Sequence, residues 1–318
     1  MHHQLVTLGE AMLRLSVRAG DQIEDALALE VHVVGSEANV AYAAARVGLK
    51  SAWVSALPDN ALGHRVATAL TAGGVDTSLV RWVPNARLGL YFVELASAPR
   101  PISVTYDRSG SAMARASVDD FDWRHVADTQ FLHVSGITLG LSASCAEIAQ
   151  RAMREARQQG ARVTFDVNYR QKLWGIEAAA NASRVAAGMA DVVICTLEDA
   201  RDLFSVQGSG EKAASHLRSE LGVETVVLTL GTEGAVAVNK EGSVKRPGHR
   251  VDTVDRVGAG DAFTAGLVWG LVDGSLELGL ERGLAMSALK MSLRGNLFRL
   301  NAADVSALIA SEGREVGR

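Results

Sequence analysis

The run Gly258-Ala259-Gly260-Asp261 joins three small residues to an acid where a helical pattern begins. Glycines let backbone N–H groups approach an anion, and the positive end of a helix dipole attracts negative charge. An acid in the first helical turn can take the proton from a hydroxyl that is held in line with a phosphate. The run therefore predicts phosphoryl transfer with Asp261 as the base. Taken alone, it fits a plain helix start with turn glycines better.

Other phosphate-binding motifs fit the sequence less well. A Walker loop, Gly-x-x-x-x-Gly-Lys-Ser/Thr, is absent, and a dinucleotide fingerprint would need a glycine where Phe263 stands. A dinucleotide loop would also follow an early strand, whereas this run lies near the C-terminus. These differences argue against a Walker-type ATPase and against a dehydrogenase.

The elements that must position this run alternate between strands and helices. Short apolar runs typical of buried strands lie at 163–167, 192–195 and 226–230, and His249–Val251 is strand-like just before the run. Apolar residues at helical spacing lie at 142–159, 198–204 and 211–221. Repeated strand–helix units predict an α/β fold with a mostly parallel sheet and helices on both faces.

One region breaks this alternation. Residues 88–95 and 102–106 are strand-like, and a turn that contains proline joins them with no helix between. The pattern predicts a β-hairpin outside the main sheet. Such a hairpin commonly forms a lid over a substrate, although an ordinary edge hairpin fits equally well.

Composition restricts the partners of the chain. The 318 residues are 48% hydrophobic, and 32 Lys+Arg against 36 Asp+Glu give a net charge of −4, so we expect no nucleic-acid partner. No apolar run approaches the ~20 residues that cross a bilayer, and no basic segment precedes an apolar signal core, so we expect a cytoplasmic protein that does not bind membranes. Cys145 and Cys195 have no metal-binding spacing and are interpreted as packing residues. A small molecule is the expected partner.

Residues 255–261 resemble the Asp-Thr-x-Gly-Ala-Gly-Asp signature of the ribokinase-like (PfkB) carbohydrate kinases, with Arg256 in the Thr position. Within that family the variant is most similar to the bacterial 2-keto-3-deoxygluconate kinases. The likeness runs from 8–12 to 293–296. It implies a single domain over 1–318, a three-layer sandwich around a mostly parallel sheet, and a small β lid formed mainly by about 11–35 and 86–109.

The resemblance also implies residues for the sugar. Gly35 and Asn39 match a sugar-binding stretch, where Gly35 would approach a hydroxyl and Asn39 would open the next helix or simply cap it. On the lid, two tyrosines would bind hydroxyls and one arginine a carboxylate. Arg170 and Asn296 match further substrate positions. The substrate set is Gly35, Asn39, Tyr91, Tyr106, Arg108, Arg170, Asp261 and Asn296.

For ATP the resemblance implies a longer set of residues. Thr229-Leu230-Gly231 resembles a phosphate-binding turn of ribokinase, although a Gly-x-x-Gly turn alone is more often a hairpin corner. The ATP set is Asn168, Thr196, Thr229, Gly231, Gly234, Gly258, Gly260 and Leu284, with Ala259 beside the transferring group. Asp199 would hold Mg²⁺, through water. Asp255 would help form a site for a monovalent cation such as K⁺.

The function that follows is transfer of the ATP γ-phosphate to the 6-hydroxyl of 2-keto-3-deoxygluconate, a sugar acid. Two alternatives stay open: a kinase of a neutral ketose, a nucleoside or another sugar acid, and an inactive sugar-binding regulator on the same fold. Residues 9–12 lack the aspartate that ribokinase and adenosine kinase use for sugar hydroxyls. Lid strands that pair between copies would form a dimer or a larger homo-oligomer.

Overall fold

The computed structural model describes residues 3–18, 20–94 and 103–311 of the 318-residue chain. Within these residues, nine strands form one sheet in the order β13-β12-β11-β10-β9-β8-β1-β4-β5. The seven strands from β11 to β5 run parallel, while β12 and β13 are antiparallel additions at one edge. The strands are β1 (His3–Leu8), β4 (Ser51–Pro58), β5 (Val80–Val83), β8 (Thr129–Ser135), β9 (Arg162–Asp166), β10 (Val192–Thr196), β11 (Thr225–Thr229), β12 (Ala235–Asn239) and β13 (Gly242–Arg246).

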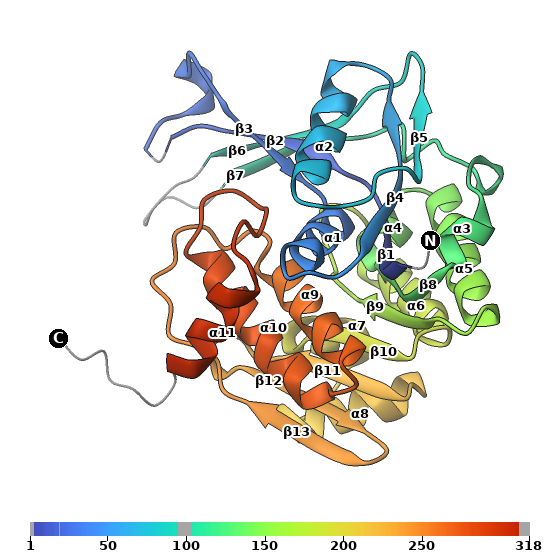
Figure 1. The fold of residues 1–318 in the computed structure, drawn as a ribbon, viewed down its shortest axis with the longest axis vertical. Coiled ribbons are helices and arrows are strands. Elements are labelled where there is room, and N and C mark those ends of the chain that lie inside the picture. The colour runs from blue at the N-terminus through green and yellow to red at the C-terminus, as the bar shows by residue number, and fades with distance from the viewer. Residues whose placement is uncertain (1–2, 19, 95–102, 312–318) are drawn as a thin grey trace.

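Helices cover both faces of this sheet, which gives the three predicted layers (Figure 1). One face carries α3 (Trp123–Ala127), α4 (Gly136–Leu141), α5 (Ala143–Gln158), α6 (Ile176–Ala187), α7 (Leu197–Phe204) and α8 (Gly210–Leu221). The other carries α1 (Ser36–Arg46), α2 (Ala61–Ala72), α9 (Ala259–Val272) and α10 (Leu276–Met291), with α11 (Ala302–Ser311) against α10. In the described part of the chain, no helix is long and apolar enough to span a bilayer.

A second sheet of four strands projects from the α1 side of the molecule (Figure 1). It has the order β3-β2-β6-β7, with β2 (Met12–Ser16), β3 (Glu30–Val34), β6 (Gly89–Glu94) and β7 (Ser103–Asp107). We call it the small sheet. Strands β6 and β7 pair antiparallel, with Tyr91 opposite Tyr106, so the predicted hairpin is confirmed. Its connecting turn at 95–102 lies outside the described residues.

The predicted strand at His249–Val251 is wrong, because these residues lie in the connection between β13 and α9. This connection leaves the edge of the sheet and docks on the end of α10. There the N–H groups of Val254 and Asp255 donate to the Met291 carbonyl, at 2.8 and 3.1 Å. Backbone groups that bond to a helix end have no need of a strand partner.

Candidate active site

The carboxyl ends of the parallel strands bring the predicted site residues to one edge of the sheet. Asp166 ends β9, Thr196 ends β10 and Thr229 ends β11, and Thr196 lies beside Thr229 in the register. Ligand sites of open α/β sheets collect at this edge. Helix α1 packs against α9, and this contact brings residues near 36 and residues near 261 together.

Helix α9 begins where the glycine run predicts. Gly258 is its N-cap and has φ +88°, a left-handed conformation that favours glycine. A Cβ there would also lie 2.5 Å from the Asn296 carbonyl oxygen. The Ala259 N–H donates to the Arg256 carbonyl at 3.2 Å, so that amide is already engaged. Asp261 lies in the first turn, beside amides that lack partners within the helix.

Two side chains of α1 hold the Asp261 carboxylate. The Ser36 hydroxyl donates to Oδ1 at 2.7 Å, and the Asn39 amide donates to Oδ2 at 2.6 Å. Because α1 begins at Ser36 with Gly35 as its cap, Asn39 does not open or cap the helix; it orients Asp261. Asp261 is only partly buried, so its carboxylate stays within reach of a substrate.

Burial raises the pKa of Asp261, and the bonds from Asn39 and Ser36 oppose this rise, as do the charges of Arg170 and Lys290. The Asn39→Ala variant therefore has a still higher Asp261 pKa. Since the predicted base must be ionised, the acid limb of turnover against pH should move to higher pH. A kcat–pH profile measures the shift. An unmoved acid limb in this variant would show that Asn39 does not tune the base.

Asn168 lies on the same network rather than apart from it. It has φ +41°, and its amide is 3.0 Å from Ser36 Oγ and 3.4 Å from Asp166 Oδ2. Burial and then the charge of Asp261 raise the pKa of Asp166 to about 8, although the charge of Arg170 opposes the rise. Ser36 and Asp166 were not among the predicted site residues. The one available signal was that Asp166 closes an apolar strand at the ligand-binding edge.

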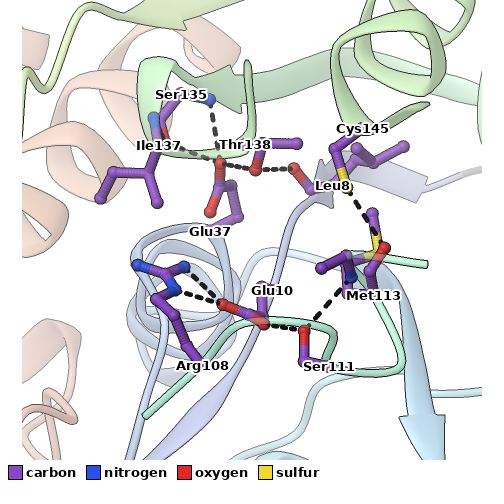
Figure 2. Close-up of polar contacts among 11 residues, drawn as sticks. Leu8, Glu10, Glu37, Arg108, Ser111, Met113, Ser135, Ile137, Thr138 and Cys145 are labelled. Carbon is purple, nitrogen blue, oxygen red and sulfur yellow. Dashed lines mark hydrogen bonds and ion pairs between the residues drawn. The ribbon is translucent and has the colours of Figure 1, made fainter. Parts of the chain in front are cut away.

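Arg108 directly follows β7 and meets a buried carboxylate of the chain itself (Figure 2). Its Nε lies 2.9 Å from Glu10 Oε2, and its Nη2 contacts the same oxygen. Ser111 donates to the other oxygen of Glu10. Glu10, which the sequence analysis did not select, thus fixes the guanidinium. Arginine has five N–H groups, so two bonds to Glu10 leave donors for a second acid.

The two predicted tyrosines lie side by side on the small sheet, with ring centroids 5.5 Å apart. Tyr91 is buried and its pKa is raised by that burial, whereas Tyr106 is 41% exposed. Asn296 is buried near Tyr91, and its Oδ1 accepts from Arg14 Nη1 at 3.2 Å. Arg14, a residue of β2 that is 1% exposed, therefore ties the small sheet to Asn296.

Gly35 and Arg170 border the same region. A Cβ on Gly35 would collide with the backbone of Glu10 and Ala11, so close packing alone requires glycine here. Arg170 is exposed, and its Nη1 donates to the Tyr169 carbonyl at 3.3 Å. Its charge lowers the pKa of Asp261, which is consistent with a cation that faces the site.

The predicted nucleotide residues occupy the neighbouring strand ends. Thr196 caps α7, and its Oγ1 accepts from the Asp199 N–H at 2.9 Å. Gly231 and Gly234 have φ +62° and +100° and form the corner between β11 and β12. Leu284 lies on α10, is 8% exposed and packs in the core that α9 and α10 share. The ATP contacts of all these residues stay predictions.

Magnesium fits the donor chemistry of this edge. Burial raises the pKa of both Asp166 and Asp199, and the charge of Asp199 raises the pKa of Asp166 further, so a divalent cation would relieve both carboxylates. Within the described residues, no three His, Cys, Asp or Glu side chains form a metal site by themselves. Such a place suits Mg²⁺, which keeps water and substrate phosphate oxygens as ligands.

A second buried carboxylate, Glu37, supports the site from behind (Figure 2). Its Oε1 accepts from Ser135 N, Ser135 Oγ and Thr138 Oγ1, at 3.0, 2.7 and 2.7 Å. It is 0% exposed, and burial raises its pKa. Glu37 follows Ser36 directly, so it anchors the start of α1, which carries both partners of Asp261.

The raised pKa of Glu37 makes stability depend on pH. A carboxyl whose folded pKa exceeds its unfolded value contributes stability that is complete below the unfolded pKa, about 4.5, and is lost as pH rises through the folded pKa. Glu37→Gln has no such dependence, so it should gain thermal stability relative to the natural protein as pH rises. Melting temperatures across this range test the prediction, with exposed Glu147→Gln as the control. A difference that is constant with pH would contradict it.

A carboxylate at a helix start, near a small sheet with an arginine and two tyrosines, suits phosphoryl transfer to a hydroxyl of a small substrate. That chemistry defines the chain as a kinase of the α/β class. Residues 2–300 match the model of the pfkB family carbohydrate kinases, and the chain belongs to that family. It is therefore an ATP-dependent carbohydrate kinase.

Named relatives cover nearly the whole chain. A 2-dehydro-3-deoxygalactonokinase of Haloferax volcanii is 39% identical over 93% of each chain. A 2-dehydro-3-deoxygluconokinase of Thermoproteus tenax is 34% identical over 92% of this chain and 89% of the relative. The crystal structure of a 2-dehydro-3-deoxygluconokinase from Thermotoga maritima superposes with a TM-score of 0.90 at 31% identity, covering 98% of this chain and 99% of that one. These likenesses bear out the predicted family and fold.

Proposed function

We propose that this kinase transfers the γ-phosphate of ATP to the 6-hydroxyl of 2-keto-3-deoxygluconate and forms 2-keto-3-deoxy-6-phosphogluconate. The observation that supports a sugar acid as the substrate is the position of Arg108. Glu10 holds its guanidinium at the base of the small sheet. An arginine fixed by one carboxylate and with donors to spare is suited to bind another.

In this proposal each part of the site has one task. Asp261 takes the proton of the acceptor hydroxyl, while Ser36 and Asn39 hold the carboxylate in place. Backbone amides of Gly258 and Gly260, which flank Ala259 at the start of α9, stabilise charge on the transferring group. Mg²⁺ held near Asp166 and Asp199 would neutralise phosphate charge.

On the substrate side, Arg108 and Arg170 bind the carboxylate of the sugar acid in this proposal. Tyr91, Tyr106 and Asn296 face its hydroxyls. ATP lies along Thr196, Thr229 and the corner formed by Gly231 and Gly234. The small sheet covers the acceptor and excludes water.

A second candidate substrate is the galactonate epimer, because the Haloferax volcanii relative is named for it. The two sugar acids differ in the configuration of one hydroxyl and share the carboxylate. Arg108 and Arg170 therefore do not discriminate between them, and the choice falls to groups that meet the ring hydroxyls.

An ATP-consumption assay over a panel of acceptors tests the proposal. The panel holds both epimers, 5-dehydro-2-deoxygluconate, fructose and ribose. We expect kcat/KM for the 2-keto-3-deoxy acids to exceed that for the neutral sugars by about 100-fold or more, since a neutral sugar offers no carboxylate to the remaining donors of Arg108. Equal use of fructose would favour the neutral-ketose alternative. No consumption with any acceptor would favour an inactive regulator.

Pairing of two copies through the small sheet belongs to the same proposal. Strands β3 and β7 are its edges, and β7 is mostly exposed. Unpaired strand edges are templates for pairing with another chain. Light scattering in solution would report a dimer.

A further inference from the structure

Lys290 is a fully buried cation close to the catalytic loop. It lies on α10, one residue before the helix end, and is 0% exposed. Its Nζ donates to the Asp255 carbonyl at 2.9 Å and to the Leu293 carbonyl at 3.3 Å. Burying an ammonium is costly unless it is paired and hydrogen-bonded, so the position requires an explanation beyond packing.

The carbonyl of Asp255 belongs to the segment that leads into the glycine run. The Asp255 carboxylate accepts from Arg14 Nη1 at 2.8 Å, from Gly295 N at 3.2 Å and from Val257 N at 3.1 Å. Lys290 Cε also lies 3.4 Å from where a Cβ on Gly258 would stand. Lys290 therefore bonds to the first residue of the segment 255–258 and lies close to its last residue, which caps α9.

Charges around this segment balance with Lys290 in place. Arg14 and Lys290 are the cations, and Asp255 and Asp261 are the anions that act on the ammonium. Burial and Arg14 lower the pKa of Lys290, while Asp255 and Asp261 raise it. In return, the charge of Lys290 lowers the pKa of Asp261 and favours the ionised base.

The monovalent cation expected at Asp255 does not fit these surroundings. Such an ion would bind backbone carbonyl oxygens, and the Asp255 carbonyl already accepts from an ammonium. A second cation would also stand close to both Lys290 and Arg14, with like-charge repulsion in a buried place. The carboxylate of Asp255 has three donors of its own.

We propose that the Lys290 ammonium is a built-in cation of the catalytic loop, which fixes the loop as a bound K⁺ would and makes turnover independent of monovalent cations. Lys290 is thus a positioning residue that acts through Asp255 and Gly258. The inference goes beyond the proposed function, and it holds for whichever sugar acid the enzyme uses.

The first test compares cations on the natural protein. Turnover is measured in choline chloride and in KCl at one ionic strength, with Mg²⁺ and ATP fixed. We expect less than about a twofold difference, because no binding event is linked to K⁺. Activation by K⁺ well beyond that would overturn the proposal.

The second test removes the ammonium. Lys290→Ala leaves space, while Lys290→Met fills the same volume without charge; exposed Lys240→Ala is the control. We expect both Lys290 variants to lose turnover about 10-fold to 100-fold, and K⁺ or NH₄⁺ to restore much of it in the Ala variant alone. A purely structural lysine would give losses that no cation restores, and that result would also overturn the proposal.

A third measurement does not depend on turnover. K⁺ and NH₄⁺ should raise the melting temperature of Lys290→Ala, and leave that of the natural protein and of Lys240→Ala unchanged relative to choline. If no sugar acid is a substrate, the proposed function fails, yet this shift still decides the role of Lys290. The same shift in all three proteins would count against the built-in cation.

Discussion

Asp261→Asn loses phosphoryl transfer and keeps its nucleotide affinity. The change preserves the size of the side chain but removes the oxygen that is proposed to take the acceptor proton. General bases contribute about 10²-fold to 10⁴-fold, so kcat should fall within that range. Turnover is measured by ATP consumption with the preferred acid, and the affinity for ATP by calorimetry. Near-natural turnover would remove Asp261 from its proposed role.

The control for this prediction is Asp252→Asn, the same change at an exposed position of the loop before α9. It should leave kcat unchanged. Ser36→Ala offers a graded comparison, because it removes one of two bonds to Asp261 and leaves the carboxylate in place. We expect a smaller loss of turnover together with a shift of the acid limb to higher pH, which a loss of folding alone would not produce.

The main sheet was predictable because its signals are local. Apolar runs placed β9, β10 and β11 within one residue of their observed starts and ends, since a strand buried on both faces has a continuous apolar sequence. The hairpin of β6 and β7 followed from a similar local pattern. The strand expected at His249–Val251 does not form; these residues belong to the connection that runs from β13 to the bonds of Val254 and Asp255 with Met291.

The partners of the base were not predictable from spacing. Ser36 and Asp261 are 225 positions apart, and only the packing of α1 on α9 joins them. Glu10 and Arg108 are likewise 98 positions apart. The resemblance selected Asn39 but did not indicate its bond to Asp261. An asparagine near a helix start can be a cap or a partner of a distant residue, and the sequence does not distinguish the two.

The burial of Lys290 was not evident from the sequence pattern, although the sequence shows a lysine in an unusual place. The apolar stretch 284–291 reads as core, and its single lysine is easily taken for a residue at a solvated edge. The structure instead buries this lysine against the catalytic loop. A charge inside an otherwise apolar stretch is thus a stronger indication of function than the apolar residues around it.

Arg108→Gln loses selectivity for sugar acids rather than activity in general. The guanidinium is the group proposed to bind the substrate carboxylate, so kcat/KM for the acid should fall about 100-fold or more, while kcat/KM for fructose changes little. The ratio of the two constants is the measurement. If neither Arg108→Gln nor Arg170→Ala weakens use of the acid, the neutral-ketose alternative gains.

This experiment needs a control for stability, because Glu10 is 2% exposed at its side chain and would lose its cation. A buried carboxylate left unpaired destabilises a fold by about 3–5 kcal/mol. The double variant Glu10→Gln with Arg108→Gln removes both charges together and restores balance. The double variant should regain stability without regaining kcat/KM for the acid. This result would separate the effect on substrate binding from the effect on folding.

An ion pair between Arg87, which precedes β6, and Asp107, which ends β7, provides a matched control. Arg87 pairs with Asp107 at 2.6 Å, but both side chains are more than 40% exposed, so the pair faces solvent. Arg87→Gln therefore removes the same charge from the small sheet without opening a buried site, and exposed pairs are worth about 1 kcal/mol or less. In Arg87→Gln the ratio of kcat/KM for the acid to kcat/KM for fructose should stay at the natural value. A loss equal to that of Arg108→Gln would mean that net charge on the sheet, rather than a fixed guanidinium, selects the acid.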